Sequence, residues 1–239
     1  MSDHIDLEIC VESVEAALEA EAGGADRIEL CADLAVGGVT PSTAVMMRAR
    51  NCLKLPLHVI VRPRAGDFVY SAGDFGEMKD QIKLAQQCGM NGIVVGILNA
   101  ARRVDVQRTS ELVQLAHPLP VTFHRAFDES CDLLEALEDV IQTGAARLLT
   151  SGGRASAIEG ASVLAEIVER SAGRISVMAG AGINASNALS LIRGTGVREI
   201  HASLGSANRA ASSADFNAGA SLRQRVRELK TLLGDRARF

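Results

Sequence analysis

Two hydrophobic patterns alternate along the chain. Short apolar runs typical of buried strands are followed by longer segments in which apolar residues recur every three or four positions, as on one face of a helix. The short runs predict eight strands, over residues 5–10, 25–31, 56–62, 92–97, 119–124, 146–150, 174–179 and 197–202. The clearest helical segments cover residues 13–24, 75–89, 132–144 and 185–196, and a last helix is predicted over 220–233. Several of these segments end in glycine just before the next strand, which is the usual helix cap ahead of a short loop.

A repeated unit runs through these elements. Glycine, a short polar turn and a buried strand recur in AGGADRIEL (22–30), CGMNGIVV (88–95), TGAARLLT (143–150) and TGVREIHA (195–202). Eight strand-then-helix units in 239 residues fit a closed (β/α)8 barrel. We therefore predict an α/β protein with a single TIM-barrel domain over residues 1–239, with the barrel at about 5–205 and a C-terminal loop and helix at 206–239. A doubly wound open sheet is the alternative, but the even number of units and the lack of a Gly-x-Gly-x-x-Gly turn after the first strand disfavour it.

Composition and charge exclude several classes of protein. No run of 18 apolar residues is present, so we expect no membrane span. The net charge is −4 with acids and bases interspersed, which provides no basic face for nucleic acid. The first residues, MSDHIDLEIC, lack the basic and apolar regions of a secretory signal, and we expect a cytoplasmic protein. In that reducing compartment the five cysteines, which form no Cys-x-x-Cys motif, are expected to be free thiols.

The first two predicted strands each carry the pattern Glu-x-Cys, in LEIC (7–10) and IELC (28–31). Side chains alternate along a strand, so the isoleucines and leucines should face the helices and the polar residues the barrel interior. The inward set is Glu8, Cys10, Glu29 and Cys31, near the strand ends where barrel enzymes place their chemistry. Buried carboxylates need cations, which we expect from Arg62 with Arg64 or Arg125. A salt-bridge layer that plugs the barrel would explain the charges, but less easily the thiols.

Two loops after predicted strands bring further charge to this rim. RPRAGDF (62–68) follows the third strand and HRAFD (124–128) the fifth, and each supplies arginine, an acid and phenylalanine. His201 ends the last strand, with Glu199 deeper. Clustered charges in a pocket separate pKa values and support acid–base chemistry. The candidate catalytic residues are Glu8, Glu29, Arg62, His124, Arg125 and Asp128.

Glycine-rich turns follow the last two predicted strands, in MAGAGIN (178–184) and ASLGS (202–206). Many barrels hold a phosphate at this place, where backbone N–H groups and a helix N-terminus favour negative charge. We predict an anion site at Gly180, Gly182 and Ser203. The alternative is that these are simply tight turns.

Five motifs together resemble the CutC family, over about residues 5–205. They are DRIELCADLAVGGVTPS (26–42), RPRAGDFVYS (62–71), PVTFHRAFD (120–128), RLLTSGG (147–153) and MAGAGI (178–183). The chain departs from the family's pattern at Ala65, where the family usually has glycine, and this restricts the loop slightly without removing a functional group. The resemblance implies a cytoplasmic TIM barrel, a homodimer or higher oligomer, and an association with copper tolerance, but no established reaction.

The residues leave three functions open. The first is copper homeostasis, with Cu(I) bound by the thiols of Cys10 and Cys31 and by His124 or His201, because this soft ion prefers sulfur ligands. The second is a metal-independent enzyme for a small anionic or phosphorylated substrate. In it Glu8 and Glu29 would be base and acid, His124 a proton shuttle, and Arg62 and Arg125 anchors. The third is a scaffold with a vestigial pocket. The expected ligand is a metal ion or small anion, a dimer is the favoured assembly, and no organic cofactor is evident.

Overall fold

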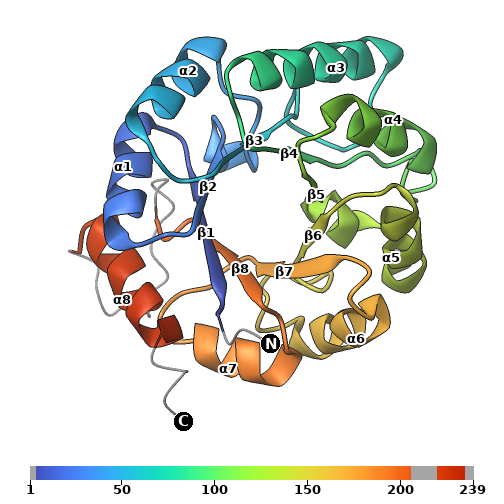
Figure 1. Ribbon diagram of the computed structural model, residues 1–239. Helices are drawn as coiled ribbons and strands as arrows, with labels where there is room; N and C mark the ends of the chain where they lie inside the picture. Colours follow the sequence, from blue (N-terminus) through green and yellow to red (C-terminus); the bar gives the residue numbers. More distant parts are fainter. Residues whose placement is uncertain (1–3, 206–219, 235–239) are drawn as a thin grey trace.

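A closed barrel of eight parallel strands forms the centre of the protein, as described by a computed structural model covering residues 4–205 and 220–234. The strands pair in chain order, and β8 closes the barrel on β1 (Figure 1). They are β1 (Asp6–Val11), β2 (Arg27–Leu30), β3 (Leu57–Ile60), β4 (Gly92–Val95), β5 (Val121–Phe123), β6 (Arg147–Thr150), β7 (Ser176–Gly180) and β8 (Glu199–Ala202). The predicted fold class is confirmed, and each predicted strand overlaps an observed one.

Helices form an outer ring around the barrel (Figure 1). They are α1 (Val14–Gly23), α2 (Thr43–Cys52), α3 (Ala72–Gln87), α4 (Val106–Ala116), α5 (Leu133–Gln142), α6 (Ala161–Ser171), α7 (Ala188–Thr195) and α8 (Leu222–Gly234). Two 3-10 helices, η1 (Leu34–Val36) and η2 (Arg125–Glu129), lie in the loops after β2 and β5. The predicted C-terminal helix is confirmed as α8, which packs on α1 and α7, whereas the predicted C-terminal loop at 206–219 lies outside the described residues.

Local chemistry fixes where the helices begin and end. The side chains of Ser13, Ser42 and Ser71 accept backbone N–H groups at the starts of α1, α2 and α3, which satisfies donors that have no partner within the helix. Gly24 ends α1 with φ of 98°, a left-handed conformation that glycine adopts without strain. Among the described residues, none of the helices has the length and apolar character that a membrane crossing requires.

The apolar core lies between the barrel and its helices. Leu7, Ile9, Ile28 and Leu30 are fully buried there, on the outward faces of β1 and β2. The alternate residues of these strands face the barrel interior, where Glu8 is fully buried and Arg27 and Glu29 almost fully. The register pairs Glu8 with Arg27 and Cys10 with Glu29, so the two strands bring their polar residues to the same heights in the barrel.

A layer of ion pairs fills the lower interior of the barrel. Arg27 of β2 donates to the carboxylates of Glu8 and Glu199, and Arg147 of β6 donates to Glu199 as well. The cations that balance the buried carboxylates therefore come from inside the barrel. The expectation that Arg62, with Arg64 or Arg125, would supply them is wrong, since Arg62 bonds to backbone carbonyls in the loops and the other two pair with aspartates.

Two glycines of the fourth strand segment make room for histidines inside the barrel. A Cβ atom on Gly92 would lie 2.4 Å from Nε2 of His58, and one on Gly96 would lie 2.4 Å from Cε1 of His124. Real side chains do not approach so closely, so each histidine ring can occupy its place only because the neighbouring residue has no side chain.

Candidate functional site

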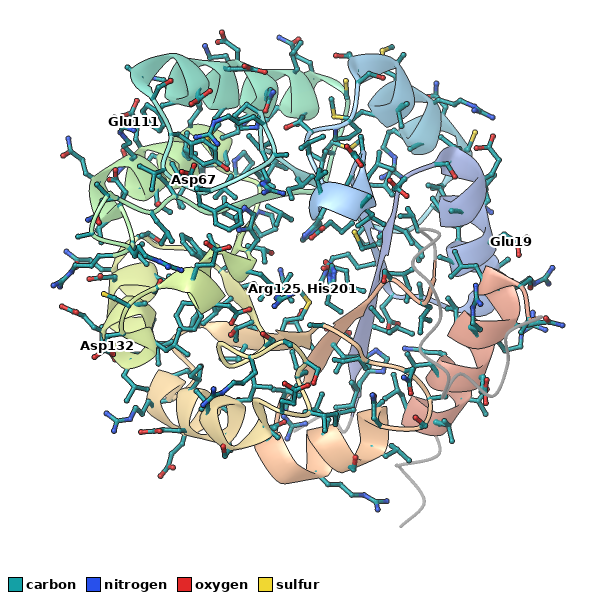
Figure 2. All side chains as sticks on the ribbon, turned by 180° about the vertical axis from the view of Figure 1, so that it is seen from behind. Glu19, Asp67, Glu111, Arg125, Asp132 and His201 are labelled. Carbon is teal, nitrogen blue, oxygen red and sulfur yellow. The ribbon has the colours of Figure 1, made fainter. Side chains whose placement is uncertain are left out.

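A cavity of about 1200 Å³ opens at the carboxyl ends of the strands. Its lining includes most of the residues that the sequence singled out, namely Cys10, Glu29, Arg62, His124, Arg125, Asp128, Gly182, His201 and Ser203. Figure 2 shows Arg125 and His201 near the centre of the ring of helices, whereas the labelled Glu19, Glu111 and Asp132 lie at its periphery. Glu8, Cys31 and Gly180 lie beneath or behind the cavity wall, since they are not among the lining residues.

The thiol of Cys10, in β1, lies at the floor of the cavity and contacts the thiol of Cys31, just after β2, behind that floor. The sulfur atoms of Cys10 and Cys31 are 3.6 Å apart, and Cys10 donates a hydrogen bond of 3.4 Å to Oε1 of Glu29. Cys31 donates to the carbonyl of Val11 and is fully buried. The contact with Cys31, burial and the carboxylate of Glu29 raise the pKa of Cys10 well above its usual value, because each of them opposes a negative charge on the sulfur.

Cys10, Glu29 and His201 each offer one atom that can ligate a metal ion, and these three atoms lie within 4.8 Å of one another. His201 Nδ1 is 2.7 Å from Oε1 of Glu8, a contact that orients the imidazole. Burial opposes the charged imidazolium, but Glu29 and Glu8 outweigh it and raise the pKa of His201. Burial also raises the pKa of Glu29. Burial acts in the same direction on Glu8, but the hydrogen bond from His201 and the charge of Arg27 outweigh it and lower the pKa of Glu8. The floor thus combines the thiol of Cys10, an imidazole and a carboxyl group, with the thiol of Cys31 directly behind Cys10.

His124 is held in a neutral state at the start of η2. Its Nδ1 accepts a hydrogen bond of 3.0 Å from the backbone N–H of Ala126, and the Phe68 ring lies 4.9 Å from its own. Burial and the nearby charge of Arg62 lower the pKa of His124 to about 3. A proton shuttle must accept a proton near neutral pH, so the role of shuttle predicted for His124 does not fit this environment.

Arg62 binds the loops that form one wall of the cavity. Its Nη1 donates to the carbonyls of Val36 and Gly38, both at 2.9 Å, and its Nη2 donates to that of Gly66 at 2.8 Å. The guanidinium thereby joins the loop after β2 to the loop after β3. Its role in the structure is to position these loops, and a substrate anion would have to compete with three backbone carbonyls for it.

Asp128 anchors the loop after β6. Its carboxylate accepts hydrogen bonds from the side chain of Thr150, the backbone and side chain of Ser151 and the backbone of Gly153, and it forms an ion pair with Arg125. Arg125 also donates to Ser151 and to the carbonyl of Arg154. Asp128 and Arg125 therefore hold each other and the loop in place. Sequence alone could not show this, because the other residues that donate to Asp128 belong to β6 and the loop after it.

An Asp128→Ala variant is expected to lose about 2–3 kcal/mol of unfolding free energy, because several buried donors would lose a charged acceptor at once. Urea unfolding at neutral pH measures this. Asp132→Ala provides a control, since Asp132 also accepts backbone N–H groups but at an exposed helix start, where water can replace it. Equal losses for the two variants would contradict the role of Asp128 as a loop anchor.

The residues predicted to bind an anion do not all lie in one place in the structure. Gly182, with φ of 71°, and Ser203 both line the cavity, as do Arg154 and Arg225. Gly180 instead lies against β6, where a Cβ atom would be 2.6 Å from Leu149. Close packing therefore explains the glycine at 180. Arg225 of α8 was not singled out from the sequence, because no motif links it to the strand ends.

Comparisons with known proteins agree with the five motifs. The family model of the CutC family matches residues 5–206. The chain belongs to the CutC family. A CutC family protein of Chromobacterium violaceum is 48% identical over 197 residues, covering 82% of this chain and 80% of the relative. The human copper homeostasis protein cutC homolog is 44% identical over 197 residues, covering 82% of this chain and 72% of the relative.

Solved structures show the same relationship at the level of the fold. A crystal structure of CutC from Streptococcus agalactiae superposes with a TM-score of 0.79 at 30% identity, covering 83% of this chain and 98% of that one. A thiamine phosphate pyrophosphorylase from Pyrococcus furiosus has a TM-score of 0.64 at 20% identity, covering 97% of this chain and 96% of that one. The second likeness shows the shared barrel fold alone. The predicted membership of the CutC family is confirmed.

Proposed function

We propose that the protein takes part in copper homeostasis by binding Cu(I) at the thiols of Cys10 and Cys31. The observation that carries this proposal is the 3.6 Å separation of the two sulfur atoms at the cavity floor, with donor atoms of His201 and Glu29 beside Cys10. The name of the human relative, a copper homeostasis protein, supports the role. We further propose a cytoplasmic location, because a reducing compartment keeps both thiols unoxidised, and a homodimer, because the resemblance to the CutC family implies one.

The chemistry of the donors fits Cu(I) better than a hard ion. Thiolates and an imidazole suit this soft cation, whereas a site for magnesium or calcium would need several oxygen ligands. The carboxyl group of Glu29 and the neighbouring sulfur make a negative charge on Cys10 unfavourable in the free protein. The thiol must lose its proton to ligate Cu(I), so binding should release a proton and become tighter as the pH rises.

A Cu(I) titration against a chromogenic chelator tests the proposal. The Cys10→Ser/Cys31→Ser double variant is expected to bind Cu(I) at least about 100-fold more weakly than the parent protein. A Cys52→Ser/Cys88→Ser/Cys131→Ser triple variant is the matched control, because these three thiols lie away from the cavity floor and should be dispensable. Parent-like affinity in the double variant would rule out this site.

A second candidate is a metal-independent enzyme that acts on a small anionic substrate. Two buried polar atoms favour it, Oε2 of Glu29 and Nε2 of His124, since both residues line the cavity and neither atom has a partner within the described structure. Arg154 and Arg225 add positive charge to the lining of the same cavity. If this candidate is right, cells that carry the Cys10→Ser/Cys31→Ser variant should tolerate copper as well as cells with the parent protein. Cells that carry Glu29→Gln should lose that tolerance.

A further inference from the structure

The tautomer of His124 follows from its hydrogen bond. A nitrogen that accepts a hydrogen bond carries no proton, and Nδ1 of His124 accepts from the backbone N–H of Ala126. The proton of the neutral ring must then reside on Nε2. This N–H group is buried, has no acceptor among residues 4–205 and 220–234, and belongs to a residue that lines the cavity.

The direction of this N–H group is fixed by packing. The Phe68 ring packs against the imidazole at 4.9 Å with an interplanar angle of 53°, and the absence of a side chain at Gly96 provides the space for the ring edge that carries Nδ1 and Cε1. The hydrogen bond from Ala126 prevents the ring from flipping. A buried donor without an acceptor costs free energy, so a rigid unpartnered donor at a cavity wall indicates a missing ligand acceptor.

The charge around His124 indicates which acceptor suits it. The imidazole is neutral at physiological pH, because burial and Arg62 oppose its protonation. The Nη atoms of Arg62 donate to backbone carbonyls, so Arg62 contributes a positive potential without offering these donors to a ligand. A neutral donor in a positive potential stabilises an oxygen that carries partial negative charge, and the stabilisation grows if that oxygen becomes more negative.

We propose that His124 binds the carbonyl oxygen of a small ligand through Nε2–H, so that the cavity takes a hydroxylated aldehyde or ketone independently of copper. The buried Oε2 of Glu29, which also lacks a partner in the described part of the chain, lines the same cavity and would accept a hydroxyl group of that ligand. The ligand class thus follows from one donor and one acceptor that are left unsatisfied on two residues lining the same cavity. This inference does not depend on the copper site.

Infrared difference spectroscopy with 13C-labelled dihydroxyacetone, in copper-free protein, tests the proposal. The carbonyl stretch of the bound probe is expected at lower frequency than in water, because a buried donor polarises the bond more strongly. Glycerol, in which the carbonyl is replaced by an alcohol, should bind about tenfold more weakly. An unshifted stretch, no binding of dihydroxyacetone, or equal binding of glycerol would each overturn the proposal.

Variants separate a contact with the ligand from a structural role. His124→Phe should lose the frequency shift and about tenfold in affinity, whereas His124→Gln, which retains an N–H donor, should restore part of both. Thr109→Val is the control, because it also removes a buried unpartnered polar group but lies in α4, away from the cavity. A shift that persists in His124→Phe would overturn the proposal.

Two further measurements keep the carbonyl proposal testable if a variant fails to fold or if the copper site is wrong. If His124→Phe does not fold, nitrogen NMR of the unaltered protein decides, since a proton on Nδ1 at neutral pH would overturn the proposal. The Cys10→Ser/Cys31→Ser variant should retain the frequency shift. Failure of the copper proposal and failure of the carbonyl proposal are therefore distinguishable.

Discussion

A Glu8→Gln variant is expected to lose about 3–5 kcal/mol of unfolding free energy, because it removes one of the two carboxylates that balance the buried guanidinium of Arg27 and also the charged partner of His201. Glu8 is fully buried, accepts from Arg27 and lies 2.7 Å from Nδ1 of His201. Burial of Glu8 is unfavourable by itself, and the hydrogen bond with His201 and the charge of Arg27 offset that cost. An amide supplies neither the charge nor both acceptor oxygens. Guanidinium unfolding at pH 7 measures the loss.

The surface provides a matched control for this ion pair. Glu15 also pairs with an arginine, Arg48, but both side chains are more than 60% exposed. Water and salt replace such a partner readily, so Glu15→Gln should change stability little. If Glu8→Gln cost no more than Glu15→Gln, the ion pairs inside the barrel would not be what holds its strands together.

The effect of Glu8 should depend on pH with a definite sign. Its pKa is lower in the folded protein than in the unfolded chain, where the pKa of glutamate is about 4.3. Its contribution is therefore fully present above that pH and is lost as the pH falls toward the folded value. The stability difference between the parent and Glu8→Gln should be largest at neutral pH and should shrink below about pH 4.

The fold and the position of the site followed from alternation along the strands. Placing the apolar residues of 5–10 and 25–31 outward put Glu8, Cys10 and Glu29 inside the barrel, and the structure has them there. The same alternation places Arg27 inside, two residues before Glu29, and it could have been found from that spacing. The strand ends alone do not reveal it, because Arg27 pairs with Glu8 lower in the barrel.

Partner choice could not be read from the sequence in the same way. Periodicity states which face a side chain occupies, but a long side chain such as that of Arg62 reaches either a carboxylate or a backbone carbonyl. Two of the three carbonyls that it reaches belong to a loop 24–26 residues earlier in the chain, and no spacing rule connects them to Arg62. The neutral state of His124 likewise depends on burial and on a neighbouring arginine, which only the assembled barrel defines.

Gly96→Ala is expected to destabilise the protein strongly, although it adds a single methyl group near the cavity. The added Cβ would lie 2.4 Å from both Nδ1 and Cε1 of His124 and 2.9 Å from Cβ of Ala126. Neither neighbour has room to move, because the ring packs on Phe68 and Ala126 is fully buried. We expect a loss of about 3 kcal/mol from overpacking, measured by denaturant unfolding.

The position of the imidazole gives this variant a second readout. Displacing His124 would break the hydrogen bond between Nδ1 and Ala126, so the side-chain nitrogen signals of His124 should change along with stability. Gly76→Ala is the control, because Gly76 lies within α3 with no atom close to the added Cβ, and alanine is the better helix former there. Gly76→Ala should leave stability unchanged or raise it. A Gly96→Ala protein as stable as the parent, with unaltered His124 signals, would mean that the ring is not clamped, and the fixed donor inferred at the cavity wall would lose its basis.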